Sequence, residues 1–451
     1  MKKLVAISIL LALITTAAFA QLSIGFHADA AVDLFSVRNG TGKAADNSEP
    51  GDVDFLSIPH ARFGNGLGLS FTYTGENYEA FLDWDLGALA DWQGHGSFYS
   101  DNGATFQDFL DQGFGDWYFK GDIGIFSGYV GNEGDGSKIS FFADAFNGDF
   151  FYYDDFADGF YCKGLKLGEA LYYITAGFEP VFVTIGTSVI RSVPDGTWNS
   201  DAINMGLRLE LDKLADVISL GFVYRILGGN ETSKHSNDLT GSSDPDGNGE
   251  WYNSIGVYAN LFVVDGLDIA FGVATEFTVY EDDMVAGDQV SFVSPFLLGI
   301  DLAVQFTGVE SLTVGLITHL WFGGITGSDN PIGVYDGQYF GKDEKGGMFG
   351  LYMALGGKYE ITENLTVGAQ LAFAVLSETA ELDVGGSTEE FINNDTTFSL
   401  GVYASYEIGG VTLQTGLSVA TESSSGKQAG SNVDAAGEIY FGIPVHFKVS
   451  W

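Results

Sequence analysis

The chain has 451 residues, with 63 Gly, 8 Pro, 14% aromatic residues and a formal net charge of −41 at pH 7. Hydrophobic residues make up 45% of it, which is too many for a disordered chain, and the single cysteine, Cys162, excludes an internal disulfide. So large an acidic excess excludes nucleic acid as a favoured partner, because phosphate contacts need Lys and Arg, and it attracts cations instead.

The first residues have the features of a secretory signal peptide. Lys2 and Lys3 precede an apolar run from Leu4 to Phe19, and the segment ends in the small-x-small pattern Ala18-Phe19-Ala20. We predict that residues 1–20 are cleaved and that 21–451 form one domain, with a net charge of −43 once the two lysines are lost. No later apolar run reaches about 18 residues, so we expect no membrane-spanning helix.

The first half of the mature chain contains segments in which apolar and polar residues alternate, as they do in strands with two different faces. We expect strands at 22–33, 67–73 and 78–88, a hairpin at 117–130 around Gly121-Asp122, one strand within 160–178, and another at 181–190 after the turn Glu179-Pro180. If the 117–130 hairpin belongs to a loop, the whole chain has sixteen strands. Otherwise it has eighteen.

The second half repeats a clearer unit, in which two alternating segments are joined by a very short turn and followed by a longer polar stretch. Segments from 203, 218, 255, 267, 296 and 312 onward each have one apolar row, and short turns fall at Asp265-Gly266, 309–311, 362–364 and Gly409-Gly410. The opposite rows are small or polar. A soluble sandwich would mix its turn lengths, whereas a transmembrane barrel has short turns at one end and long loops at the other. The pattern therefore predicts an all-β, antiparallel transmembrane barrel of 16–18 strands with long acidic extracellular loops.

The last strand, "YFGIPVHFKVSW", alternates to its final residue. Phe447, Val449 and Trp451 lie on its apolar row. With the signal peptide and the repeated amphipathic strands, this ending resembles bacterial outer-membrane porins, whose last strand ends on an aromatic residue that the barrel assembly machinery reads. The resemblance implies an outer-membrane location in contact with lipid and a lipopolysaccharide-type surface. It also implies a homotrimer as one form of assembly, and no porin subfamily matches residue by residue.

A barrel of 16–18 strands encloses an aqueous channel, and we expect no plug domain. We therefore predict a passive pore for small hydrophilic solutes. Residues 131–158 stand where porins have a loop that narrows the lumen, and carboxylates there would favour cations. The alternative is that the aromatic residues of this loop pack outside the pore. The candidate constriction residues are Glu133, Asp135, Asp144, Asp149, Asp154, Asp155 and Asp158.

Charged residues on the polar rows of the strands are candidates for the lumen lining. Basic residues there would set a field across the lumen against the acidic loop. The candidate lumen charges are Lys120, Arg208, Arg225, Asp268, Glu276, Asp301, Lys358, Glu360 and Glu407.

Other functions stay open at this stage. Aromatic residues in 89–113 would suit a sugar-specific channel, and a transporter of hydrophobic compounds or a surface antigen or adhesin would use the same barrel. Asp244, Asp246 and Asn248 resemble the start of a calcium loop, but Ile255 stands where an EF-hand needs Glu, so only a weak calcium site is expected. None of the six His lies in a nucleophile motif. We expect no other cofactor and no enzymatic activity.

Overall fold

The computed structural model describes the chain in thirteen stretches: 21–41, 52–54, 66–85, 114–131, 172–188, 203–229, 250–280, 295–326, 334–335, 338–339, 345–384, 387–428 and 431–450. Within these ranges the chain forms strands and tight turns. None of the described residues belongs to a helix long and apolar enough to cross a membrane. The predicted signal peptide, residues 131–158 apart from Gly131, the 244–248 loop and Trp451 lie outside the described residues.

The strands fall into a group of mostly short strands and a group of longer ones. The first half contains β1 (Gln21–Thr41), β2 (Asp52–Asp54), β3 (Gly66–Thr74), β4 (Tyr78–Asp85), β5 (Phe114–Ile123), β6 (Phe126–Gly131), β7 (Tyr172–Phe178), β8 (Val181–Ser188), β9 (Ile203–Leu214) and β10 (Ile218–Gly229). The second half contains β11 (Glu250–Val264), β12 (Leu267–Tyr280), β13 (Pro295–Val309), β14 (Leu312–Thr326), β15 (Val334–Tyr335), β16 (Gln338–Tyr339), β17 (Lys345–Thr362), β18 (Leu365–Val384), β19 (Ser387–Ile408), β20 (Val411–Gln428) and β21 (Ser431–Ser450).

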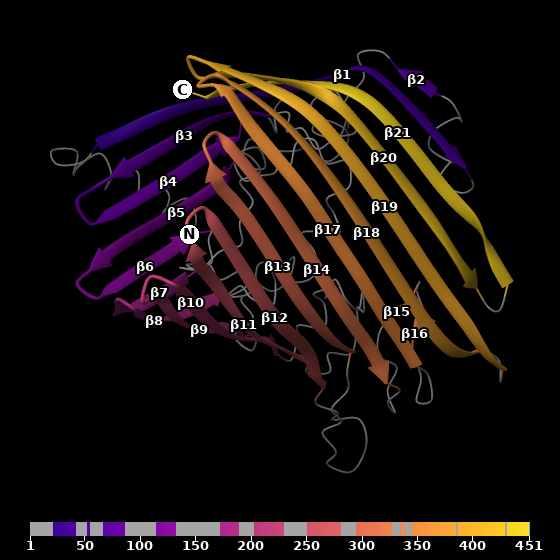
Figure 1. The fold of residues 1–451 in the computed structure, drawn as a ribbon. Coiled ribbons are helices and arrows are strands. Elements are labelled where there is room, and N and C mark those ends of the chain that lie inside the picture. The colour runs from indigo at the N-terminus through magenta and orange to yellow at the C-terminus, as the bar shows by residue number, and fades with distance from the viewer. Residues whose placement is uncertain are drawn as a thin grey trace, which may run out of the picture.

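The sheet closes on itself through β1. Residues 27–41 of β1 pair antiparallel with β21, while residues 21–29 pair antiparallel with β3. The short β2 pairs only with β1, and β15 pairs with β16 as a separate hairpin. The remaining eighteen strands form one closed antiparallel barrel (Figure 1), which confirms the predicted fold class and the higher of the two strand counts.

Short turns gather at one end of the barrel, together with the last residues of β21. At Gly409-Gly410 both residues have positive φ, +57° and +79°, the backbone that a two-residue hairpin turn requires and glycine adopts without cost. One predicted turn was wrong: β5 and β6 meet at Gly124-Ile125, not at Gly121-Asp122. Gly124 has φ +63°, whereas Gly121 lies within β5 and pairs with Tyr78 and Gly128. The hairpin is nevertheless part of the wall.

Strands β18 to β21 are much longer than the roughly ten-residue segments expected from the sequence. They have 20, 22, 18 and 20 residues, about twice the 9–11 residues that a tilted strand needs to cross a bilayer. Their outward residues change from Val375, Phe398 and Val419 to Ser377, Thr396 and Thr421 toward the end far from the short turns. This part of the wall therefore projects beyond the apolar zone into water.

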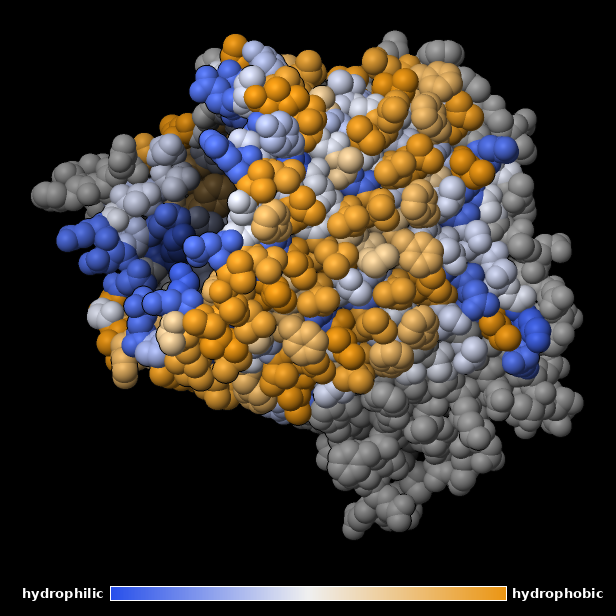
Figure 2. Space-filling view, viewed as in Figure 1, coloured by the Kyte–Doolittle hydropathy of each residue, from blue (hydrophilic) through white to orange (hydrophobic). Residues whose placement is uncertain are grey.

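The two faces of the barrel differ sharply. Outward residues of successive strands form an exposed apolar belt, seen as the orange band in Figure 2. A hollow lined by hydrophilic residues lies beside it, at the left of that view. Inward positions carry mostly small, polar and charged side chains, together with aromatic rings such as those of Trp321 and Tyr403. Examples from the belt are Ile185, Leu209, Val257, Phe271, Leu355, Val402, Leu417, Ile439 and Phe447.

Candidate functional site: the inner wall of the barrel

Strands β9, β10 and β11 place a carboxylate and a tyrosine together on the inner wall. Glu210 of β9 and Tyr258 of β11 both lie opposite Gly221 of the intervening β10. The Tyr258 ring lies over Gly221, where a side chain would collide with it, and its hydroxyl donates a hydrogen bond of 3.1 Å to Glu210 Oε1. The glycine thus allows a contact across three strands, and both polar groups are buried.

A carboxylate and an imidazole form a second inner-wall pair on β13 and β14. Asp301 and His319 are direct cross-strand partners, and Asp301 Oδ1 lies 2.7 Å from His319 Nδ1. The imidazole also packs against the ring of Tyr352 on β17, with centroids 5.6 Å apart. All three side chains are buried. Burial of a carboxylate requires such a partner, because desolvation of an unpaired charge is costly.

Other large inward rings also lie against glycine backbone rather than standing out into the lumen. Trp321 covers Gly350 of the neighbouring strand, and Tyr403 covers Gly368 in the same way. Each ring fills the gap that the glycine leaves beside it. The wall therefore accommodates bulky aromatic residues that lie along it and do not extend into the lumen.

Four aromatic residues form a continuous stack along the inner wall of the first half. Phe81 of β4 packs on Tyr118 of β5, Tyr118 on Tyr129 of β6, and Tyr129 on Tyr173 of β7, with centroid distances of 5.3, 5.9 and 4.5 Å and interplanar angles of 23°, 27° and 6°. Rings 4.5 Å apart must overlap face to face, because rings lying side by side would collide. Tyr129 and Tyr173 therefore cover each other's faces, whereas the wider spacing of the other rings leaves Tyr118 open to further contacts.

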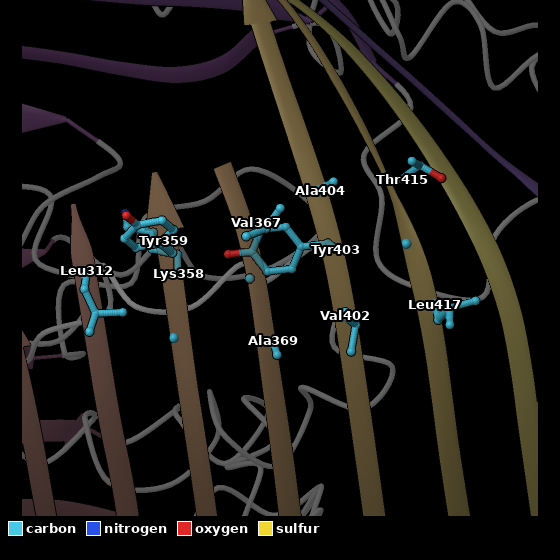
Figure 3. Close-up of a pocket in the computed structure, with 13 residues that line it drawn as sticks. Leu312, Lys358, Tyr359, Val367, Ala369, Val402, Tyr403, Ala404, Thr415 and Leu417 are labelled. Atoms are coloured by element: carbon cyan, nitrogen blue, oxygen red, sulfur yellow. The ribbon is translucent and has the colours of Figure 1, made fainter. Parts of the chain in front are cut away.

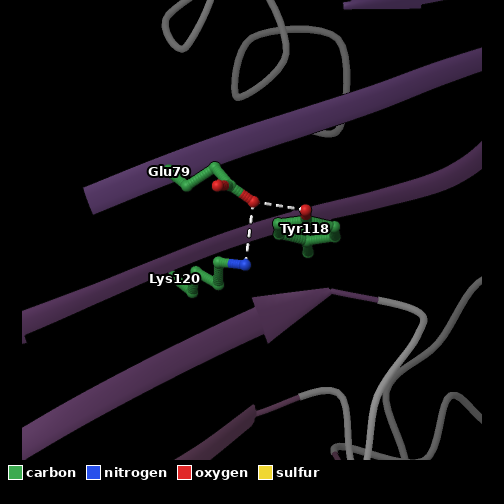
Figure 4. A network of polar contacts seen from close by, with 3 residues as sticks. All are labelled: Glu79, Tyr118 and Lys120. Atoms are coloured by element: carbon green, nitrogen blue, oxygen red, sulfur yellow. Dashed lines mark hydrogen bonds and ion pairs between the residues drawn. The ribbon is translucent and has the colours of Figure 1, made fainter. Parts of the chain in front are cut away.

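An ion pair borders this stack on the side of the short turns (Figure 4). Glu79 of β4 and Lys120 of β5 are direct cross-strand partners, with Lys120 Nζ 2.8 Å from Glu79 Oε1. The Tyr118 hydroxyl donates to the same carboxylate oxygen. The Lys120 ammonium also lies 5.0 Å from the Tyr118 ring centroid, within the range of a cation–π contact. The carboxylate thus holds an ammonium beside an aromatic ring.

The structure places most of the predicted lumen charges on inward positions. Lys120, Arg208, Arg225, Asp268, Asp301, Lys358, Glu360 and Glu407 all lie on the face opposite the apolar belt. Glu276 pairs with the inward Ser254, and its side chain is outside what the structure describes. Their effect on ion selection stays a prediction. Among these residues, Lys120 forms an ion pair with Glu79, and Asp301 lies beside the imidazole of His319.

The other predicted site residues fall into two groups. Phe447 and Val449 lie on the outward face of β21, whereas Trp451 is outside the described residues. The candidate constriction and calcium-loop residues are also outside them, so their roles stay predictions. Within the described part of the chain, no group of three or more His, Cys, Asp or Glu residues is placed to hold a metal ion.

Sequence reasoning missed Glu79 and the tyrosines of the aromatic stack, Tyr118, Tyr129 and Tyr173, and it also missed Tyr258, which contacts Glu210. The alternation places Tyr118 and Lys120 on one face, and this signal was available. The pairing of β4 with β5 was not, because residues 86–113 separate these strands in the sequence. Cross-strand neighbours depend on register, and the register of strands joined by a long segment cannot be read from alternation alone.

An apolar groove of about 680 Å³ lies along strands β14, β17, β18, β19 and β20 near their short turns (Figure 3). Its lining includes the outward residues Tyr359, Val402 and Leu417, which belong to the apolar belt, and the inward residues Lys358 and Tyr403. Most of the lining is apolar. The groove therefore fits the hydrocarbon environment of the belt better than a polar solute.

No protein-family model matches the chain, and no curated protein matches it. Among solved structures, Pseudomonas aeruginosa OccK9 (OpdG) is similar at 10% identity and TM-score 0.41, over 96% of this chain and 98% of that one. Acinetobacter baumannii OccAB3 is similar at 11% identity and TM-score 0.40, over 96% of this chain and 99% of that one. The trimer form of Vibrio cholerae outer-membrane protein OmpT is similar at 9% identity and TM-score 0.39, over 96% of this chain and 100% of that one. Identities this low establish no correspondence between residues of these proteins and residues of this chain.

The closed barrel with its apolar belt places the protein in the outer membrane. A sheet can cross a bilayer only when it closes and leaves no unpaired edge in the hydrocarbon. An even number of antiparallel strands, an apolar outer band and a polar interior are the features of outer-membrane barrels, and eighteen strands enclose a channel. The porin-type architecture inferred from the last strand is thus confirmed at the level of fold, and the protein is an outer-membrane barrel channel.

Proposed function

We propose that the channel conducts small hydrophilic solutes by passive diffusion and prefers cations. The observation that carries this proposal is the charge of the described inner wall, where acidic side chains outnumber basic ones. Fixed charges lining a pore concentrate ions of the opposite sign. The inward acidic residues are Glu79, Asp83, Asp122, Glu210, Asp212, Asp268, Asp301, Glu360, Asp395, Glu407, Glu422 and Glu438, and the basic ones are Lys120, Arg208, Arg225, Lys358 and Lys448.

The proposal is tested by reconstituting the folded barrel in a planar bilayer and measuring single-channel conductance and reversal potential in a salt gradient. We expect steady open-channel steps and a reversal potential on the cation-selective side. Raising the ionic strength should weaken the preference, because salt screens fixed charges over about 10 Å at 0.1 M. A folded barrel that does not conduct, or one that prefers anions, would refute the proposal.

Matched variants separate wall charge from net charge. Asp268→Asn and Glu422→Gln each neutralise an inward carboxylate, and together they should shift the reversal potential toward zero. The double variant Glu310→Gln and Glu363→Gln removes the same two charges from exposed turns, one between β13 and β14 and one between β17 and β18, outside the lumen. It should leave the reversal potential unchanged. If both changes shift the potential equally, the surface rather than the wall sets the preference.

A substrate-selective channel is the second candidate, and the aromatic stack beside the Glu79–Lys120 pair favours it. Charge selection alone does not need stacked rings on the inner wall. Ordered aromatic and charged groups together are the means by which a pore recognises one class of solute. A channel specific for sugars, a transporter of hydrophobic compounds and a surface antigen or adhesin remain alternatives from the sequence, and a homotrimer and the absence of catalysis remain predictions.

A further inference from the structure

We propose that Glu79 and the Tyr118 ring form a binding site for primary alkylammonium groups on the lumen wall, and that Lys120 is its tethered occupant. This inference rests on the proposed function, because the ligand must reach the site through the channel. The solute class is short alkyl chains that end in –NH₃⁺, because the Lys120 side chain already makes this contact on the wall.

The contacts of Lys120 show what the site accepts. Its ammonium lies 2.8 Å from Glu79 Oε1 and 5.0 Å from the centroid of the Tyr118 ring. A carboxylate offers the charge and the hydrogen-bond acceptor that an ammonium needs, and an aromatic ring adds a second, electrostatic attraction. The Lys120 stem from Cβ to Nζ is a butylammonium group, so the chain itself shows that such a group fits.

The site is held rigid by its neighbours. Tyr118 donates its hydroxyl to Glu79 and so fixes the carboxylate beside its own ring. The same ring contacts Phe81 and Tyr129 of the two neighbouring strands, with centroids 5.3 and 5.9 Å away, and Tyr129 is stacked on Tyr173. A stack that spans four strands limits the rotation of each ring. Preorganised groups of this kind bind without first losing conformational freedom.

Lys120 is a weakly held occupant. Its side chain is 51% exposed and that of Glu79 is 26% exposed. Partly exposed ion pairs contribute little, because water and salt screen them and both side chains lose freedom. An ammonium from solution can therefore replace Lys120 on the carboxylate. While it does so, the Lys120 charge moves into the lumen and repels further cations, so occupancy is self-limiting.

The test uses n-butylammonium, which reproduces the Lys120 side chain, as the probe of single-channel current in the reconstituted full-length barrel. Lys120→Met removes the tethered occupant and keeps the apolar stem. We expect butylammonium to reduce the current of this variant in a saturable way, at about a fivefold lower concentration than in the unaltered protein. Glu79→Gln in the Lys120→Met background should remove the effect. Tetramethylammonium, which has no N–H donor, should reduce the current weakly in all of them.

Lys358→Met is the matched control, because it removes an inward lysine that is not part of this site. It removes the same positive charge from the wall, so it should lower the effective butylammonium concentration much less than Lys120→Met does, and the difference between the two variants reports the site. Lys120→Gln is a second variant if Lys120→Met folds poorly, and heat-dependent gel mobility checks folding in each case.

Equal responses in Lys120→Met, Lys358→Met and the unaltered protein would overturn the ammonium site and leave the cation-preferring channel standing. The same holds if Glu79→Gln has no effect on the Lys120→Met response. Absence of conductance from every folded variant would instead overturn the channel, and the site with it.

Discussion

Replacing Gly350 by Ala tests whether the inner wall depends on aromatic rings that lie against glycine backbone. Trp321 is fully buried and lies directly opposite Gly350 across β14 and β17. A methyl group at position 350 would overlap the indole atoms Cε2, Cζ2 and Cδ2 of Trp321. The strand backbone is fixed by pairing on both sides, so the ring has to leave its position.

The size of the effect follows from two opposing terms. Forcing an extra carbon into a packed site destabilises the fold by about 1–3 kcal/mol. In the opposite direction, replacing Gly by Ala stabilises the fold by about 0.4–1 kcal/mol, because it reduces the conformational entropy of the unfolded chain. We therefore expect Gly350→Ala to lower the free energy of unfolding by about 1–2 kcal/mol. The measurement is urea unfolding of the barrel in detergent micelles, followed by heat-dependent gel mobility.

Gly357→Ala is the matched control on the same strand. A side chain there meets its nearest atoms, Thr313 O and Val314 Cγ2, at the ordinary distances of 3.6 and 3.7 Å. It should be neutral or slightly stabilising. Replacing Trp321 by Leu should also reduce the penalty at position 350, because the smaller side chain makes room. Equal free energies of unfolding for Gly350→Ala and Gly357→Ala would refute the reasoning. So would a cost of Gly350→Ala that stays the same when Trp321 is replaced by Leu.

Three further predictions concern other parts of the barrel. Tyr258→Phe removes the hydrogen bond to buried Glu210 and should lower the free energy of unfolding by about 1 kcal/mol in the same urea assay. Val402→Lys places a charge in the apolar belt and should cost about 2–4 kcal/mol, whereas Ser405→Lys, on the inward face of the same strand, should cost much less; similar costs would contradict the assigned faces. Deleting Trp451 should reduce the folded barrel recovered from outer membranes while folding into detergent is unchanged, since the residue is predicted to act through assembly.

The faces of the strands could be predicted from the sequence, and so could the barrel. Alternation depends only on neighbouring residues, so Phe447 and Val449 were assigned outward, and Arg208 and Asp301 inward, without knowledge of any pairing. Most short turns were also visible. The turn between β5 and β6 was misplaced because this segment has two glycines, Gly121 and Gly124, at which a turn could form. Only the pairing of Gly121 with Tyr78 shows that Gly121 lies within a strand.

The partners of the inward residues could not be predicted, because they depend on register between strands. Alternation places His319 on the polar row, but its contact with Asp301 follows from a pairing register of the β13–β14 hairpin that alternation does not reveal. The Glu79–Lys120 pair needs the register of strands separated by 28 residues, 86–113. Alternation therefore places the lumen charges on one face of the wall, but it does not show which of them are neighbours.

The distribution of charge on the wall argues that selectivity is shared among many residues. Two of the basic side chains lie near acidic ones: Lys120 contacts Glu79, and Arg208 lies two residues from Glu210 on the same face of β9. The acidic excess comes instead from residues farther round the barrel, among them Asp268 of β12 and Glu438 of β21. Because screening limits each charge to about 8–10 Å, no single carboxylate reaches the whole cross-section of an eighteen-strand barrel. Neutralising one carboxylate should therefore move the reversal potential only slightly, and the shift should grow with each further inward carboxylate removed.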